Sequence, residues 1–244
     1  MRYLGGKSRI AKPILEVILA NATERTGVYW EPFIGGGGMA SKAAKHFNRC
    51  IYSDQDEDLM LMWEALATGW EPPEQVSEEE YKALRHAEPS ALRGFVGYGC
   101  SFGGKWFGGY ARSKKISGDP RGHCGESQRS VLKGIKDMTS PAGGFEFHCA
   151  PYHACQPQPG DVVYCDPPYA GTTKYRGKPF NHEEFWRTAR AWAEQGVHVF
   201  VSEYNAPEEW ECVWEKSQHV FVAGAMNGNE YKKNVERLFM FRSV

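Results

Sequence analysis

The residues best suited to chemistry are Asp166-Pro167-Pro168-Tyr169, which directly follow an apolar run over residues 162–165. The run predicts a buried strand, and the two prolines, which lack an N–H and have fixed φ angles, end it in a stiff turn. A carboxylate, a bare proline carbonyl and a flat ring then lie at the carboxyl edge of a sheet, where open α/β folds bind ligands. An acid and a carbonyl can accept both protons of an exocyclic amine while a ring stacks on a base. We therefore expect chemistry on a nucleobase amino group, with a proline-stopped strand and a surface acid as the alternative.

A second motif, Phe33-x-Gly35-x-Gly37, follows a predicted strand over residues 28–33 and opens a helix. Glycine permits positive φ and lets the backbone approach a ligand closely. Asp54 lies nineteen residues after Gly35, at the end of the next strand, where a carboxylate can bind ribose hydroxyls. The pattern favours a nucleotide-like cofactor. A turn without a ligand, and a nicotinamide-dependent oxidoreductase, also fit these residues.

A third motif is the N-terminal segment, residues 3–7, with the sequence Tyr-Leu-Gly-Gly-Lys. Its two glycines leave the backbone open, and Lys7 could reach a carboxylate. A mobile terminus with a solvated lysine is the alternative.

Alternating strand and helix patterns must position these motifs, and they predict a mostly parallel sheet of the α/β class. The predicted helices cover residues 10–19, 39–47, 58–67 and 182–195, the last with Asn181 as its N-cap and Gly196 as its stop. The predicted strands cover residues 28–33, 50–53, 145–148, 161–165, 197–202, 219–223 and 235–242, with a polar loop over 227–234. Residues 94–144 are rich in glycine, aromatics and bases with weak periodicity, which indicates an inserted, partly irregular module.

The bulk composition of the 244 residues is that of a globular protein, with a net charge of −1. No apolar run approaches the ~20 residues that span a bilayer, and the N-terminus lacks the apolar core of a signal peptide. Because the seven cysteines have no framework spacing, we expect reduced thiols and a cytoplasmic location, in a bacterium or a phage-infected cell.

The charges are unevenly distributed along the chain. Residues 56–88 hold ten acids and two bases, whereas residues 105–136 hold eight bases and two acids. A local basic patch of this kind can contact phosphates, although a solvated basic surface fits equally well.

Taken together in chain order, these motifs resemble the DNA adenine-N6 methyltransferases of the Dam type, the alpha-ordered group or D12 class. The motifs that carry the resemblance are Tyr3-Leu4-Gly5-Gly6-Lys7, Glu31-Pro32-Phe33-x-Gly35-x-Gly37, Asp54 and Asp166-Pro167-Pro168-Tyr169. Residues 95–110 are also similar to the family's aromatic, glycine-rich stretch, and residues 227–238 are similar to its closing hairpin. Residues 111–144 match least, and in such enzymes this region helps to choose the DNA sequence.

The resemblance implies a Rossmann-like S-adenosylmethionine-dependent methyltransferase sheet formed by residues 1–58 and 145–244. A mainly helical or irregular target-recognition module would be inserted over residues 59–144. The implied activity is methyl transfer from S-adenosylmethionine to N6 of an adenine flipped out of DNA, because N6 cannot be reached inside a stacked duplex.

The resemblance also assigns roles by position. The residues implied to bind the cofactor are Tyr3, Lys7, Phe33, Gly35, Gly37, Asp54 and Asp166. The implied catalytic residues are Asp166, Pro167, Pro168 and Tyr169. Asp166 and the Pro167 carbonyl would each accept a proton of adenine N6, and Tyr169 would stack on the flipped base.

The expected partner is double-stranded DNA, with no membrane and with a monomer expected although the oligomeric state is open. The bases expected to contact DNA are Lys105, Arg112, Lys114, Lys115, Arg121, Lys174, Arg176, Lys232 and Lys233. Trp106 and Phe107 could insert into DNA or form the core of the module. The histidines and cysteines between residues 123 and 155 lack paired spacing, so no metal is expected.

Three other functions remain open. The first is the same chemistry on another amine, such as cytosine N4, an RNA adenine or a protein glutamine. The second is the oxidoreductase, which leaves Asp166 to Tyr169 unexplained. The third is a DNA-binding protein that has lost catalysis. Such a protein would have no reason to keep Asp166.

Overall fold

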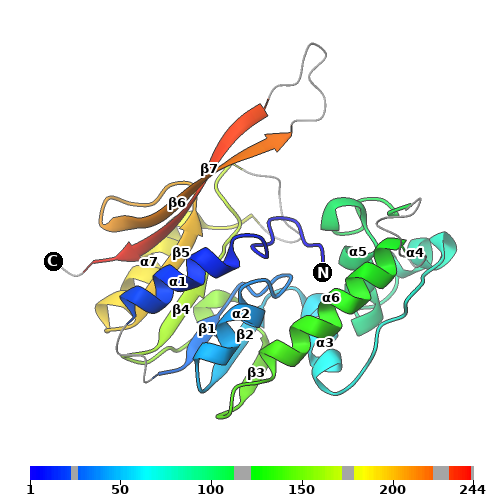
Figure 1. Ribbon diagram of the computed structural model, residues 1–244, viewed down its shortest axis with the longest axis horizontal. Coiled ribbons are helices and arrows are strands. Elements are labelled where there is room, and N and C mark those ends of the chain that lie inside the picture. Colours follow the sequence, from blue (N-terminus) through cyan, green and yellow to red (C-terminus); the bar gives the residue numbers. More distant parts are fainter. Residues whose placement is uncertain (23–26, 113–121, 172–178, 222–230, 243–244) are drawn as a thin grey trace.

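A computed structural model describes residues 1–22, 27–112, 122–171, 179–221 and 231–242, arranged around a seven-stranded sheet (Figure 1). The strands are β1 (Tyr29–Glu31), β2 (Cys50–Asp54), β3 (Phe145–Cys149), β4 (Val162–Cys165), β5 (His198–Glu203), β6 (Trp210–Phe221) and β7 (Tyr231–Phe241). Their order across the sheet is β3-β2-β1-β4-β5-β7-β6. The first five pair in parallel, and β7 is antiparallel to both of its neighbours. The expected Rossmann-like α/β fold is confirmed.

In the sequence, α1 precedes β1 and the other helices connect the strands. In space, the helices cover both faces of the sheet (Figure 1). The α-helices are α1 (Ala11–Asn21), α2 (Ala40–Ala43), α3 (Glu57–Ala67), α4 (Glu78–Leu84), α5 (Ala91–Gly99), α6 (Gly122–Met138) and α7 (His182–Glu194). The short 3-10 helices are η1 (Ala44–His46), η2 (Phe102–Gly104) and η3 (Tyr152–Ala154). The predicted ends of α7 are confirmed, because Asn181 accepts a hydrogen bond from the Glu184 N–H and Gly196 has a φ of 91°.

Alternate side chains along the central strands belong to two hydrophobic clusters, one on each face of the sheet. Tyr164 and Phe200 belong to a large cluster with residues of α1, α2, α3, α5 and α6. Val163 and Val199 belong to a smaller one with residues of α7. Burial of β4 and β5 on both faces explains why their sequences are continuous apolar runs.

The strand order reverses between β1 and β4, because β2 and β3 follow β1 in one direction and β5 follows β4 in the other. Ligands of open α/β sheets bind outside the carboxyl ends of the strands at such a reversal. The glycine turn begins after β1 and Asp166 follows β4, so the topology places these two motifs side by side.

The segment between β2 and β3 is more regular than its sequence indicates. Residues 94–144, expected to be partly irregular, contain the seventeen-residue helix α6. The buried positions of α6 have helical spacing, but several are polar or small, so its apolar periodicity is weak; these positions include Cys124, Gln128, Val131, Ile135 and Met138. Because residues of α3, α5 and α6 share the large cluster with the sheet, these helices pack onto the sheet rather than around a separate core.

The C-terminal hairpin is longer than predicted. The strand expected over residues 219–223 begins at Trp210, and the pairing of β6 with β7 shifts register between Cys212 and Trp214. Residues 231–234, expected in a loop, are part of β7. Polar and charged residues interrupt the apolar ones in these extensions, which is usual for an edge hairpin and hides it from a search for apolar runs.

Alanine substitutions at two helical glycines should change the free energy of unfolding in opposite directions. A Cβ on Gly94 of α5 would lie 2.1 Å from the Asp58 carbonyl oxygen of α3, whereas one on Gly134 of α6 would meet nothing within 4 Å. Gly94→Ala should therefore destabilise the protein by about 1–3 kcal/mol through overpacking. Gly134→Ala should stabilise it by roughly 0.5–1 kcal/mol because alanine favours the helix. Urea unfolding would measure both, and equal effects would contradict the close packing of α5 on α3.

Candidate active site

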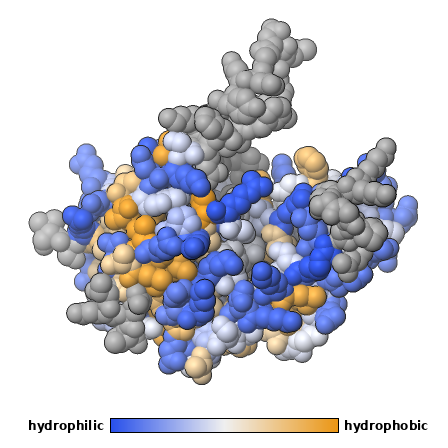
Figure 2. Space-filling view, in the orientation of Figure 1, coloured by the Kyte–Doolittle hydropathy of each residue, from blue (hydrophilic) through white to orange (hydrophobic). Residues whose placement is uncertain are grey.

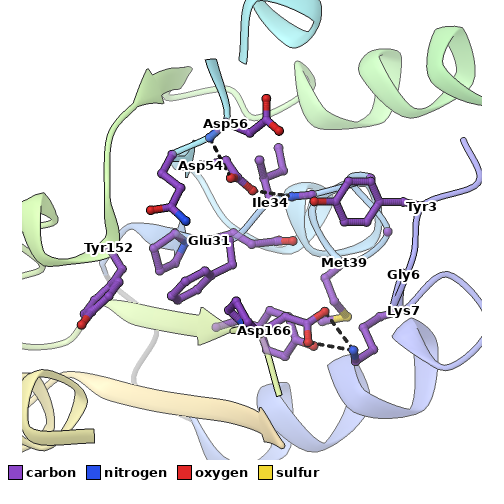
Figure 3. A pocket seen from close by; sticks show the side chains of 18 of the residues that line it. Tyr3, Gly6, Lys7, Glu31, Ile34, Met39, Asp54, Asp56, Tyr152 and Asp166 are labelled. Atoms are coloured by element: carbon purple, nitrogen blue, oxygen red, sulfur yellow. Dashed lines mark hydrogen bonds and ion pairs between the residues drawn. The ribbon is translucent and has the colours of Figure 1, made fainter. Parts of the chain in front are cut away.

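A pocket opens at the carboxyl edge of the sheet, at the reversal between β1 and β4 (Figure 3). The space that it encloses, counted together with open solvent at its mouth, is about 860 Å³. The expected site residues that line it are Tyr3, Lys7, Phe33, Gly35, Asp54, Asp166 and Pro168. The pocket therefore brings together all four motifs that the sequence indicates.

The glycine turn fits closely against its neighbours. Gly35 and Gly37 have φ angles of 45° and 69°, in the left-handed region that favours glycine. A Cβ on Gly35 would lie 2.8 Å from the Tyr3 ring, and one on Gly37 would lie 3.0 Å from the Trp63 ring. There is no room for a side chain at either position, and at Gly35 the main chain itself borders the pocket.

Asp54 ends β2 and turns its carboxylate towards the glycine turn (Figure 3). One oxygen accepts a hydrogen bond from the Gly35 N–H at 3.2 Å, and the other accepts one from the Asp56 N–H at 3.1 Å. Desolvation raises the pKa of Asp54 to about 6, and the backbone hydrogen bonds oppose that shift. Since each carboxylate oxygen can accept two hydrogen bonds, Asp54 can still receive ligand hydroxyls at the pocket wall.

Lys7 and Asp166 form a nearly buried ion pair beside the pocket (Figure 3). The Lys7 Nζ atom lies 2.7 and 2.9 Å from the two carboxylate oxygens, and it also donates to the Gly5 carbonyl at 3.0 Å. Only 7% of the Lys7 side chain is exposed. Burial raises the pKa of Asp166, and the Lys7 ammonium limits the rise by favouring the ionised form.

Tyr169 is held by three neighbouring side chains. Its hydroxyl donates to the Glu236 carboxylate, and its ring meets the Tyr204 ring edge-on with centroids 4.8 Å apart. The Lys7 Nζ atom lies 4.7 Å from the centroid of the Tyr169 ring. The main chain beyond the ring is also fixed, because the Ala170 N–H donates to Glu203 at 3.1 Å.

Three buried acids near the site were not among the residues expected from the sequence. Glu31, Glu203 and Glu236 are 2%, 3% and 8% exposed. Burial raises the pKa of Glu31 to about 8 and that of Glu203 to about 7. Glu203 could have been found, because an acid that ends an apolar strand is the same signal that drew attention to Asp166. Glu236 gives no local signal, because only the pairing of β7 with β5 brings it to the site.

The remaining expected site residues are placed differently. Gly37 and Pro167 are not part of the pocket lining, and Pro167 is buried. Phe33 lines the pocket and packs against other aromatic rings, with the Tyr152 ring stacked at 5.5 Å. Tyr169, like Gly37 and Pro167, is not part of the pocket lining.

The bases expected to contact DNA are only partly visible. Lys105 is exposed, whereas Arg112 pairs with Glu78 at 2.7 Å. Lys114, Lys115, Arg121, Lys174 and Arg176 lie outside the described residues, and the side chains of Lys232 and Lys233 on β7 are also outside the description. The basic stretch continues on α6, where exposed bases lie on a largely hydrophilic surface (Figure 2): Arg129, Lys133 and Lys136.

The aromatic residues of the module divide between core and surface. Phe107 is buried, and Trp106 packs against Tyr98 with ring centroids 4.8 Å apart, so both contribute to the core. Phe102, which was not among the expected residues, is 76% exposed on η2. Within the described part of the chain, no group of three or more histidines, cysteines or acids could hold a metal ion, and no helix could span a membrane.

The buried acids predict how stability depends on pH. The pKa of Glu31 is about 8 in the folded protein and about 4.5 when unfolded, so folding binds a proton and stability falls as pH rises between these values. Asp54 and Glu203 have raised pKa values too and act in the same direction. Glu31→Gln should therefore gain on the order of 1–3 kcal/mol relative to wild type between pH 5.5 and 8.5. Urea unfolding at both pH values measures this, with exposed Glu208→Gln as the control; parallel pH curves for Glu31→Gln and wild type would contradict a buried, protonated Glu31.

Several solved structures resemble this chain in arrangement. A protein of Pyrococcus horikoshii assigned as an RNA methyltransferase has 10% identity and a TM-score of 0.45, with 96% of this chain and 83% of that chain covered. The assigned methyltransferase yhhF of Escherichia coli has 12% identity and a TM-score of 0.40, covering 96% and 87%. A precorrin 8W decarboxylase of Methanobacterium thermoautotrophicum has 9% identity and a TM-score of 0.41, covering 95% and 90%. Likenesses this distant carry no weight for the reaction.

No curated relative matches the chain in sequence. The family model of the D12 class N6 adenine-specific DNA methyltransferases matches residues 3–91. This stretch contains the N-terminal segment, the glycine turn and Asp54, and Asp166 to Tyr169 lie beyond it at the same pocket. Over this stretch the match confirms the expected resemblance to the D12 class of N6 adenine-specific DNA methyltransferases.

Proposed function

We propose that the protein transfers a methyl group from S-adenosylmethionine to N6 of an adenine that has been flipped out of double-stranded DNA. The observation that carries the proposal is the position of the Asp166 carboxylate, at the rim of a pocket that the glycine turn and Asp54 also line. An acceptor for an amine and a cradle for a nucleoside cofactor thus share one cavity.

The residues present fit S-adenosylmethionine. Close packing leaves no space for a Cβ at Gly35, so a ligand there would meet main chain, and Asp54 retains acceptors for ribose hydroxyls. Tyr3, Lys7, Phe33 and Gly37 would complete the binding surface, with Gly37 shaping the turn. The cofactor supplies an electrophilic methyl group on a sulfonium, so no covalent enzyme intermediate is required.

The proposed work of the protein at N6 is to orient the nitrogen and accept its hydrogen bonds. The N6 lone pair is delocalised into the ring, and bonds from both N6 protons, to Asp166 and to the Pro167 carbonyl, favour a pyramidal nitrogen. Acceptors that meet this geometry best in the transition state raise the rate rather than only the affinity. Lys7 leaves this role open to Asp166, because each carboxylate oxygen has two acceptor positions.

Tyr169 and Pro168 would form the wall for the flipped base. Stacking of a base on an aromatic ring is worth about 1–3 kcal/mol and would offset part of the cost of flipping. Because Lys7 lies over the Tyr169 ring, the base would approach the part of the ring that the ammonium leaves uncovered.

The proposed DNA contacts come from residues 59–144, the module expected to recognise the target, and from the loop after Tyr169 and the hairpin β6–β7. The exposed Lys105 lies beside η2, and the Gly104 carbonyl accepts a hydrogen bond from the N–H of Leu4, which lines the pocket. Basic side chains at this rim would bind phosphates next to the target base, and their contribution should weaken with salt.

The nearest rival is methylation of another amine, because an acid and a carbonyl can hold cytosine N4 in the same way. Labelled methyl transfer to DNA followed by nucleoside analysis separates the two. N6-methyladenine supports the proposal, whereas N4-methylcytosine, or label found only in RNA, overturns the choice of substrate.

The Asp166 variant tests the role of the carboxylate directly. Asp166→Asn keeps the shape of the side chain but replaces one acceptor by a donor, so methyl transfer should fall by at least about a hundredfold. Binding of S-adenosylhomocysteine, measured by calorimetry, should persist because Asp54 and the glycine turn are intact. Glu208→Gln, on an exposed loop, is the matched control. Undiminished methyl transfer by Asp166→Asn would refute the proposed role.

A further inference from the structure

A second acid, Glu236, contacts the Lys7 ammonium of the Lys7–Asp166 pair. Glu236 lies on β7, is 8% exposed, and has one carboxylate oxygen, Oε1, that accepts the Tyr169 hydroxyl proton. The same Oε1 atom lies 3.4 Å from the Lys7 Nζ atom. A single oxygen thus joins the ring of Tyr169 to the ammonium that holds Asp166.

We propose that Glu236 is a positioning residue for methyl transfer: it holds Tyr169 and Lys7 so that the ring and the Asp166 carboxylate keep a fixed relation at the pocket. The inference deepens the proposed function and rests on it. No local pattern in the sequence indicates it, because residues 169 and 236 come together only through the antiparallel insertion of β7 beside β5.

The energetics favour a specific role over a packing role. A buried carboxylate is costly unless it is paired, and a neutral side chain would fill the same place on β7 without that cost. Glu236 also shares Lys7 with Asp166, so it reduces the fraction of the ammonium charge that Asp166 receives. This leaves Asp166 a better acceptor for an incoming amine than it would be in an exclusive ion pair.

Neighbouring contacts explain why the hydroxyl of Tyr169 is the point that needs support. The main chain just beyond it is already fixed, because Ala170 donates to Glu203 on β5. Tyr204 meets the edge of the ring, and the bond to Glu236 fixes where the hydroxyl end of the side chain lies. Glu203 therefore fixes the loop and Glu236 fixes the ring, from two adjacent strands.

A double-mutant cycle tests the pair through methyl-transfer kinetics. Glu236→Gln removes the charge at Lys7 and weakens the bond to Tyr169, while Tyr169→Phe removes the donor and leaves β7 unchanged. Each should lower kcat about tenfold, the loss expected for one hydrogen bond to a charged group. The double variant should lose clearly less than the product of the two single losses, because both changes break the contact between Tyr169 and Glu236. KM for S-adenosylmethionine should stay within about twofold of wild type, since Asp54 and the glycine turn are untouched.

Glu208→Gln is the control, because Glu208 is exposed on the turn between β5 and β6. It should leave kcat unchanged. Losses that multiply in the double variant, or a Glu236→Gln variant as active as wild type, would overturn the role of Glu236 alone. A wild-type protein that methylates no DNA overturns the proposed function instead, so the two failures are distinguishable. If Glu236→Gln fails to fold, Tyr169→Phe decides, and wild-type kcat in that variant would also overturn the inference.

Discussion

The buried contact between Lys7 and Asp166 is the interaction on which the arrangement of the site depends. It joins the N-terminal segment to the end of β4, and it thereby brings the Tyr3 ring against Gly35 at the pocket wall. Neither charge could remain at such low exposure alone, since loss of one partner of a buried pair costs about 3–5 kcal/mol. The N-terminal glycines serve this contact, because Gly5 has a φ of 77° and its carbonyl accepts a second bond from Lys7.

Around this pair the site has an excess of acids. Glu31 and Glu203 are buried at the carboxyl ends of β1 and β5, and Glu236 is buried within the antiparallel strand β7; burial, with repulsion from Asp166, raises the pKa values of Glu31 and Glu203. The pocket lining itself includes Asp54, Asp56 and Asp166 beside one ammonium, and an acidic lining of this kind favours a positively charged ligand. The same excess explains why stability should decline with rising pH.

Much of the fold and part of the site could be predicted because their signals are local. Buried strands such as β4 are continuous apolar runs. The turn after β1 has positive φ angles at Gly35 and Gly37, which favour glycine. The helix α6 was missed because its buried face uses Cys124 and Gln128, which a search for apolar periodicity does not count. The expected strand is shorter than β6 because polar and charged residues interrupt the apolar ones along β6, so no continuous apolar run marks its start.

The acids that support the site were missed for a different reason. Glu236 reaches Tyr169 only through the pairing of β7 with β5, and no spacing in the sequence encodes that meeting. The sequence indicates only that Lys7 could reach a carboxylate. In the structure that carboxylate is Asp166, which the chain brings to Lys7 from 159 residues away. Interactions between residues far apart in sequence thus complete a site whose individual motifs are local.

The most direct test of the central ion pair is the pH dependence of single-turnover methyl transfer in Lys7→Met, a neutral side chain of similar length. Lys7 lowers the pKa of Asp166, so its removal should raise that pKa, and the acid limb of the rate should move to higher pH by about one unit or more. An acid limb at the wild-type pH, with the rate merely reduced, would show that Lys7 does not control the ionisation of Asp166.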